Sequence, residues 1–136
     1  MARIVLAKVG TDAHDNGITV VAHWLEEAGH EVVYAGLYNT PESLAHIAGE
    51  EGADAVGVSY LGGEPVYLSQ RILDVMRDSG LDIPLVVGGV ITPEVAAELN
   101  DLGVRHIFTA GSTRATIVDG LARAMDGRGH NLPRTG

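Results

Sequence analysis

The segment Asp12-Ala13-His14-Asp15-Asn16-Gly17 has the residue types and the spacing of a metal-binding loop. It follows the first apolar run of the chain, Ile4-Val5-Leu6-Ala7. A carboxylate two residues before a histidine can orient one ring nitrogen, so that the other nitrogen is free to bind a metal. A glycine three residues further on lets a bulky group approach the start of the next helix. The alternative interpretation is an ordinary turn that happens to contain a histidine, and this segment alone does not decide between the two.

The rest of the chain alternates short apolar runs with segments of helical periodicity. We expect strands at residues 4–9, 31–35, 55–59, 85–87 and 106–108. Apolar side chains recur at helical spacing in the five segments between and after these runs. These segments contain Ile18, Val21 and Trp24; Leu44 and Ile47; Leu68 and Ile72; Val95 and Leu99; and Ile117 and Leu121. Their order predicts five strand–helix units.

Residues that start and stop helices support this division. Thr40-Pro41-Glu42 and Thr92-Pro93-Glu94 each have the pattern of an N-cap, a proline in the first turn and an acidic residue. Gly29, Gly52, Gly80 and Gly103 each follow a helical segment, where a glycine commonly ends the helix.

The predicted strands are almost entirely apolar, which is typical of a parallel sheet buried on both faces. Five units with right-handed crossovers predict a flavodoxin-like (Rossmann-like), doubly wound α/β domain with strand order 2-1-3-4-5. We expect this domain to occupy residues 1–126, followed by a flexible tail at 127–136. Ligands of such folds bind beyond the carboxyl ends of the strands, where the loop containing Asp12 and His14 is expected.

Composition excludes several classes of function. The net charge of −9 disfavours binding to nucleic acid and to anionic membrane surfaces. Cysteine is absent, which fits a reducing compartment. The first residues lack the pattern of a signal peptide, and no apolar run approaches the length of a membrane span. We therefore expect a cytoplasmic protein.

Three further loops are expected at the same edge of the sheet as Asp12 and His14. They are Ser59-Tyr60-Leu61-Gly62-Gly63-Glu64-Pro65, Gly88-Gly89-Val90 and Thr109-Ala110-Gly111-Ser112-Thr113. Each carries glycine or a small hydroxyl residue where a larger side chain would fill the space between the strands. Together they predict a deep slot that admits a flat or elongated ligand.

The Asp-x-His-x-x-Gly, Ser-x-Leu and Gly-Gly motifs, in this order, resemble the cobalamin-binding domain of adenosylcobalamin-dependent mutases. The resemblance covers the chain except its tail. It implies that His14 is the axial ligand of the cobalt, in the position that the displaced dimethylbenzimidazole leaves. It further implies that Asp12 accepts a hydrogen bond from His14 and that Lys8 holds Asp12 ionised.

The resemblance also assigns roles around the nucleotide tail of the cofactor. Gly17 lets the helix start lie close to the tail, Ser59 forms a hydrogen bond with it and Leu61 packs against it. Gly88 and Gly89 leave room along the fourth strand. Gly111-Ser112 corresponds to a Gly-Thr pair of the family that borders the nucleotide, and serine keeps the hydroxyl without the methyl group.

The same resemblance implies a subunit that does not work alone. In the family a barrel of the TIM type binds the substrate, and this chain contains no such segment. We therefore expect an adenosylcobalamin-binding small subunit of an acyl-CoA mutase, such as the 2-hydroxyisobutyryl-CoA or methylmalonyl-CoA type, with a large barrel subunit as partner. Alternatives are the small subunit of glutamate mutase and a corrinoid methyl carrier, which usually has an additional helical bundle. A phosphoacceptor receiver is disfavoured, because Ser59 stands where it needs an aspartate.

Overall fold

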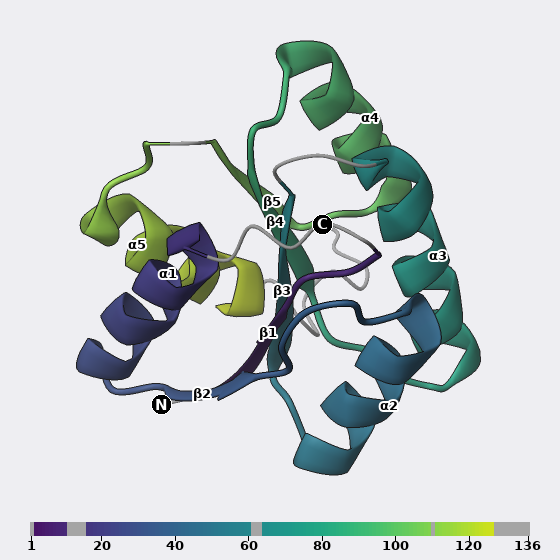
Figure 1. Cartoon of the computed structure of the whole chain (residues 1–136), viewed down its shortest axis with the longest axis horizontal. Coiled ribbons are helices and arrows are strands. Elements are labelled where there is room, and N and C mark those ends of the chain that lie inside the picture. Colours follow the sequence, from purple (N-terminus) through teal and green to yellow (C-terminus); the bar gives the residue numbers. More distant parts are fainter. Residues whose placement is uncertain (1, 11–15, 61–63, 110, 127–136) are drawn as a thin grey trace.

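The protein is described by a computed structural model that covers residues 2–10, 16–60, 64–109 and 111–126. Strands and helices alternate strictly along the chain (Figure 1). The strands are β1 (Arg3–Ala7), β2 (Glu31–Tyr34), β3 (Ala55–Tyr60), β4 (Leu85–Gly89) and β5 (His106–Thr109). The helices are α1 (Asn16–Glu27), α2 (Pro41–Glu51), α3 (Pro65–Asp78), α4 (Pro93–Leu102) and α5 (Arg114–Asp126).

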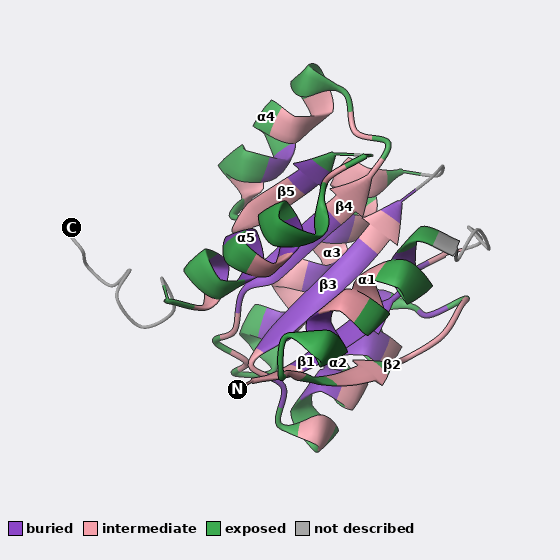
Figure 2. Cartoon of the chain, turned by 90° about the vertical axis from the view of Figure 1, so that its left-hand side faces the viewer, coloured by how far each residue is buried: buried purple, intermediate pink, exposed green. Residues whose placement is uncertain are grey.

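The five strands form one parallel sheet in the order β2-β1-β3-β4-β5, which confirms the predicted flavodoxin-like topology. Helices α1 and α5 cover one face of the sheet, and α2, α3 and α4 cover the other (Figure 1). We call these the α1/α5 face and the α2–α4 face. The central strand β3 is buried along most of its length, because helices cover it on both sides (Figure 2).

Neighbouring residues of each strand contribute to different cores, since side chains alternate between the two faces. Val56, Val58 and Tyr60 of β3 belong to the core beneath α2, α3 and α4. Ile4 and Leu6 of β1 belong to the core beneath α1 and α5. The nearly continuous apolar strands of the sequence therefore build two separate cores.

The predicted helix boundaries are confirmed at α2 and α4. The Thr40 hydroxyl accepts a hydrogen bond from the Ser43 backbone N–H at 3.0 Å, and the Thr92 hydroxyl accepts one from that of Val95 at 3.2 Å. Gly52 and Gly103 end these helices in the left-handed conformation. These local signals fix where each helix meets the edge of the sheet.

The carboxyl ends of all five strands differ from the expectation, those of β2, β3 and β5 by a single residue. Strand β1 ends at Ala7 rather than Val9, because the segment after β2 takes over the pairing: the Lys8 N–H donates to Gly36, and Val9 forms an isolated bridge with Asn39. Conversely, β3 extends to Tyr60, and Gly88 and Gly89 are the last residues of β4 rather than a loop. They stay in the sheet because they pair in register with Ser59 and Tyr60.

Two further expectations concern the chain as a whole. Residues 127–136 lie outside the described part of the structure, so the separation of a tail from the domain stays a prediction. Within the described residues, no helix is long and apolar enough to cross a membrane.

Candidate cofactor site

A cavity of about 380 Å³ lies between the α1/α5 face of the sheet and the two helices that cover it. One wall is formed by α1 and the opposite wall by the first two turns of α5 and the residues just before it. The described residues that line it come from seven segments and are Leu6; Gly17, Ile18, Val20, Val21, Trp24 and Leu25; Gly57, Val58 and Ser59; Val86, Val87, Gly88 and Gly89; Phe108 and Thr109; Gly111 and Ser112; and Ile117 and Leu121. The cavity therefore reaches from the carboxyl edge of the sheet into the core.

The floor of this cavity is made of small residues at neighbouring positions of β3 and β4. Ser59 pairs with Gly88 across the two strands, and Gly57 precedes Ser59 on the same face. A Cβ atom at Gly88 would meet nothing closer than the Phe108 carbonyl oxygen, at 3.5 Å. A Cβ at Gly57 would come within 2.7 Å of Leu6 Cδ2 and would force that side chain to move. Larger residues at these positions would occupy the space that forms the cavity.

A glycine is required at position 89 for a different reason than at position 88. Its φ of +123° is in the range that residues with a side chain rarely adopt, and a Cβ would lie 1.9 Å from the Tyr60 carbonyl oxygen. The same carbonyl accepts a hydrogen bond from the Val90 N–H at 3.0 Å. Gly89 is thus needed for the close packing of β4 on β3, in addition to bordering the cavity.

The end of β3 is held in place by two buried polar side chains. The ammonium group of Lys8, which is 0% exposed, donates to the Ser59 carbonyl oxygen at 2.8 Å. On the opposite face, the Tyr60 hydroxyl lies 3.1 Å from the Ser69 hydroxyl of α3. Burial raises the pKa of Tyr60 to about 12, since the charged phenolate would be poorly solvated there. These contacts fix the strand segment that presents Ser59 to the cavity.

Most of the predicted site residues that the structure describes do come together. Gly17, Ser59, Gly88, Gly89, Gly111 and Ser112 all line the cavity. Lys8 does not line it but contacts Ser59, as described above. Asp12, His14 and Leu61 lie outside the described residues, so their predicted roles stay predictions.

Several residues of the cavity were not singled out from the sequence. Gly57 carries a recognisable signal, because a glycine in the interior of a strand often marks a close approach of another group. Trp24, Ile117 and Leu121 carry none, since their helical spacing equally predicts core residues. Only the three-dimensional arrangement separates the apolar residues that fill the core from those that surround a space.

The chemistry of the lining restricts what the cavity can hold. Its described walls contain no charged side chain and no side-chain amide. The Ser59 hydroxyl forms no hydrogen bond with another described residue, while the Ser112 hydroxyl donates to the Thr109 carbonyl at 2.7 Å. An elongated neutral ligand with a hydrogen-bonding atom near Ser59 fits these walls, because the rest of its surface would meet apolar side chains.

The fold and this cavity define a class: a doubly wound α/β domain with a mainly apolar cavity at the carboxyl edge of its sheet. The B12 binding domain family matches residues 2–118 of the chain. The chain therefore belongs to the B12-binding domain family, whose ligand is cobalamin. The glycine floor and the apolar walls fit the flat nucleotide base of such a ligand.

Individual relatives place the chain within this family. It is 38% identical to the 2-hydroxyisobutanoyl-CoA mutase small subunit of Aquincola tertiaricarbonis, over 93% of this chain and 94% of that protein. It is also 38% identical to ethylmalonyl-CoA mutase of Cereibacter sphaeroides, over 79% of this chain but 16% of that protein. A cobalamin-binding protein from Desulfitobacterium hafniense has a similar structure, with a TM-score of 0.78 and 25% identity, covering 90% of this chain and 58% of that one. Comparable domains thus occur both as separate subunits and within longer mutases.

Proposed function

We propose that this chain is the adenosylcobalamin-carrying small subunit of an acyl-CoA mutase and works with a separate barrel subunit that binds the substrate. The observation that carries the proposal is the end-to-end match with a mutase small subunit, which covers 94% of that relative. A match only to a longer mutase would not indicate whether the cofactor and the substrate are bound by separate subunits. The bound cofactor would supply the radical chemistry, and this chain would bind and orient it.

The cavity residues would hold the nucleotide tail of the cofactor. The pairing of Ser59 with Gly88 supports this, since it places a hydroxyl beside the open floor. Gly17, Gly89, Gly111 and Ser112 border the same cavity. Their small side chains would let the tail lie close to the backbone.

His14 would bind the cobalt in the base-off/His-on state, in which a protein imidazole replaces the lower base of the cofactor. A neutral imidazole is a suitable ligand for a transition metal, and a carboxylate such as Asp12 would fix its tautomer. The burial of Lys8 supports a charged partner nearby, because an isolated ammonium is costly to bury. In this proposal Lys8 keeps Asp12 ionised, and Leu61 packs against the tail.

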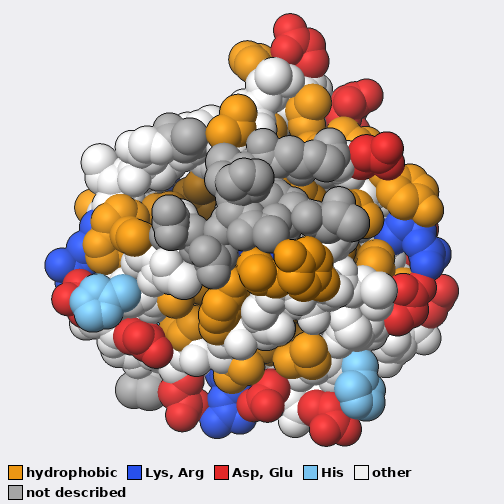
Figure 3. Space-filling model, viewed as in Figure 1, with side chains coloured by type: hydrophobic (Ala, Val, Ile, Leu, Met, Phe, Trp, Pro, Cys, Tyr) orange, Lys and Arg blue, Asp and Glu red, His pale blue; other side chains and the backbone are white. Residues whose placement is uncertain are grey.

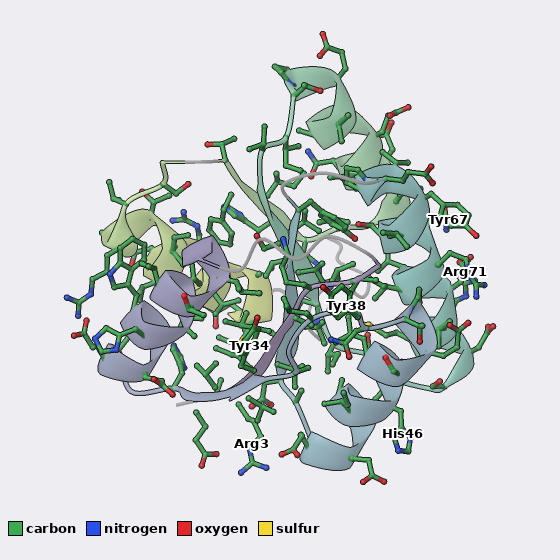
Figure 4. The ribbon with its side chains drawn as sticks, in the orientation of Figure 1. Arg3, Tyr34, Tyr38, His46, Tyr67 and Arg71 are labelled. Atoms are coloured by element: carbon green, nitrogen blue, oxygen red, sulfur yellow. The ribbon has the colours of Figure 1, made fainter. Side chains whose placement is uncertain are left out.

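The barrel subunit would dock on the carboxyl edge of the sheet. Exposed apolar side chains near this edge support the proposal: Tyr38 follows β2, Tyr67 lies in the first turn of α3 and Val90 follows β4. Their exposed fractions are 63%, 58% and 60%, respectively. Hydrophobic side chains gather around the middle of the face in Figure 3, and Tyr67 projects outward from α3 in Figure 4.

A visible spectrum of the protein mixed with adenosylcobalamin or hydroxocobalamin tests the cofactor part of the proposal. We expect a base-off/His-on spectrum that His14→Ala abolishes. The matched control is His46→Ala, because His46 is an exposed residue of α2 on the other face of the sheet (Figure 4). Absence of cobalamin binding, with and without a candidate large subunit, would refute the proposal.

Size-exclusion chromatography with a purified large subunit tests the docking part. We expect a complex that Tyr67→Ser and Val90→Ser weaken while cobalamin binding by the chain alone is retained. Replacement of the exposed Arg77, in the last turn of α3 and thus at the other end of that helix from Tyr67, by serine serves as the control. A cytoplasmic location is part of the same proposal.

A further inference from the structure

We propose that Asn39 is a positioning residue for the binding of cobalt by His14, and that its side-chain amide fixes the path along which the chain leaves β1. This rests on the proposed function, because it takes His14 as the cobalt ligand. It goes further by assigning a role to a buried residue that does not line the cavity. We call residues 8–10, which follow β1, the exit segment, and residues 35–40 the β2–α2 loop.

Asn39 lies in the β2–α2 loop and is 8% exposed. Within the described residues, the other buried polar or charged side chains are those of Lys8 and Ser69, and both support the end of β3 as described above. A buried side-chain amide is unfavourable unless its nitrogen and its oxygen form hydrogen bonds. The partners of Asn39 therefore show which parts of the chain this residue holds together.

The amide of Asn39 joins three segments. Its nitrogen donates to the carbonyl oxygens of Gly36 at 3.0 Å, Lys8 at 3.2 Å and Ala35 at 3.3 Å. Its oxygen accepts a hydrogen bond from the Ser43 hydroxyl, at 3.3 Å, in the first turn of α2. Both ends of the amide are thus engaged, and the nitrogen is the end that contacts the exit segment.

The backbone around Asn39 pairs with the same segment. The Asn39 N–H donates to the Lys8 carbonyl at 3.1 Å, and the Gly10 N–H donates to the Asn39 carbonyl at 2.9 Å. The Lys8 N–H donates to the Gly36 carbonyl at 3.0 Å, and Val9 forms an isolated parallel bridge with Asn39. The Lys8 carbonyl therefore accepts both the backbone and the side-chain N–H of Asn39. These bonds hold the exit segment against the β2–α2 loop beyond the end of the regular ladder.

The residue before Asn39 has an unusual backbone. Tyr38 has a φ of +61° and is the only residue other than glycine with a positive φ in the described part of the chain. A tyrosine rarely adopts this conformation, and such strain persists where the surrounding contacts determine the backbone. The hydrogen bonds of Asn39 are contacts of this kind, since they are made by the next residue of the same turn.

The exit segment leads directly to the predicted cobalt ligand, because His14 is four residues after Gly10. A metal ligand has to be held within about 0.5 Å of its productive position. A change in the path of the exit segment would therefore reduce cobalt binding by His14. The cavity would be affected less, since Asn39 does not line it. Loss of the Asn39 amide should thus separate binding of cobalamin from ligation of its cobalt.

The test uses Asn39→Asp, which keeps the size of the side chain and the oxygen that accepts from Ser43. It replaces the donating nitrogen by an oxygen that faces three carbonyl groups. We expect the fraction of bound adenosylcobalamin or hydroxocobalamin in the His-on state, measured by its visible spectrum, to fall at least about fivefold. Ser43→Ala is the matched control, because it removes the partner of the amide oxygen and leaves those of the nitrogen. It should lower the His-on fraction less than about twofold.

A double-mutant cycle distinguishes positioning from a general loss of stability. Quenching of Trp24, which lines the cavity and is the only tryptophan of the sequence, measures cobalamin affinity in Asn39→Asp, His14→Ala and the double variant. If Asn39 acts through His14, Asn39→Asp should weaken binding in the chain with His14 and have almost no effect in the chain with His14→Ala. An equal loss of affinity in both backgrounds would refute the inference.

Hydrogen exchange tests the contact without any cofactor. Asn39→Asp should raise the exchange rate of the Gly10 amide at least about tenfold, because that amide donates to the Asn39 carbonyl. If circular dichroism shows that Asn39→Asp does not fold, Tyr38→Pro and Tyr38→Gly take its place. Proline requires a φ of about −65°, whereas glycine permits the observed value. Both lack the tyrosine ring, and Tyr38→Pro should have the lower His-on fraction.

The outcomes separate this inference from the proposed function. If the unmodified chain gives no His-on spectrum, the proposed function fails and the role of Asn39 fails with it. If the unmodified chain gives that spectrum and Asn39→Asp gives it to the same extent, the proposed function stands and the positioning role is refuted. The same holds if Ser43→Ala lowers the His-on fraction as much as Asn39→Asp does.

Discussion

The two faces of the sheet are built differently, although the same strands form both. Beneath α2, α3 and α4 the core is filled by large side chains such as Leu44, Ile72 and Leu99, all 0% exposed. Beneath α1 and α5 the core surrounds a cavity of about 380 Å³. Burial of apolar surface stabilises a fold, whereas space within a core forfeits contacts. The comparison indicates that the core beneath α2, α3 and α4 is completely filled, whereas the core beneath α1 and α5 leaves a space open to a ligand.

The difference arises from alternate residues of single strands. Along β3, Val58 and Tyr60 point toward the filled core, while Gly57 and Ser59 point toward the cavity. Along β4, Val87 faces the filled core and Gly88 the cavity. One strand can therefore contribute large side chains to the filled core and small residues to the cavity, because successive side chains point to opposite faces of the sheet.

The largest effect is expected where the two glycines of β4 are exchanged for alanine. Gly89→Ala places a methyl group on the Tyr60 backbone at a φ of +123°, so it should cost about 5 kcal/mol of unfolding free energy or prevent folding. Gly88→Ala should fold nearly normally and lower cobalamin affinity about tenfold, because its methyl group enters the cavity. Urea unfolding and Trp24 quenching measure the two effects. Equal loss of stability in both variants would contradict the distinction.

The next largest effect is expected when a buried leucine on either face of the sheet is replaced by alanine. Leu44→Ala should lower the free energy of unfolding by about 4 kcal/mol, since it opens a new space in a filled core. Leu121→Ala should lower it by about 2 kcal/mol, because Leu121 already borders a cavity and loses fewer contacts. Affinity for cobalamin, corrected for the folded fraction, should change in Leu121→Ala alone. Urea unfolding monitored by circular dichroism gives both stabilities.

A smaller and pH-dependent effect is expected at Tyr60, in the filled core. Its pKa is raised to about 12 in the folded state, against about 10 in an unfolded chain. Folding therefore favours the protonated hydroxyl, and this contribution is fully present below pH 10 and lost as the pH rises toward 12. Its loss amounts to about 3 kcal/mol. Unfolding curves recorded between pH 9 and 12 should show this decline, and Tyr60→Phe should reduce it.

The sequence predicts the fold more completely than the site, for a physical reason. Helix caps such as Thr40 and the apolar strands are local signals, and they were sufficient for the topology that the sheet adopts. The small residues of the cavity, Ser59 and Gly88 among them, were also visible as motifs. The cavity itself depends on which apolar residues leave a space between them, and neither Trp24 nor Leu121 differs in pattern from an ordinary core residue. Gly88 and Gly89 looked alike in sequence, and only the position of the Tyr60 backbone distinguishes them.

The smallest effect is expected from removing a helix cap on each face of the sheet. Thr92 caps α4 on the filled side, and Thr113 accepts the Thr116 N–H at 3.2 Å at the start of α5. Alanine at either position should cost about 1 kcal/mol of unfolding free energy, because each removes one capping hydrogen bond. Only Thr113→Ala should also weaken cobalamin binding, by up to about threefold, since Thr113 follows Gly111 and Ser112 at the cavity. An equal change in affinity in both variants would mean that stability rather than the local shape of the α1/α5 face governs binding.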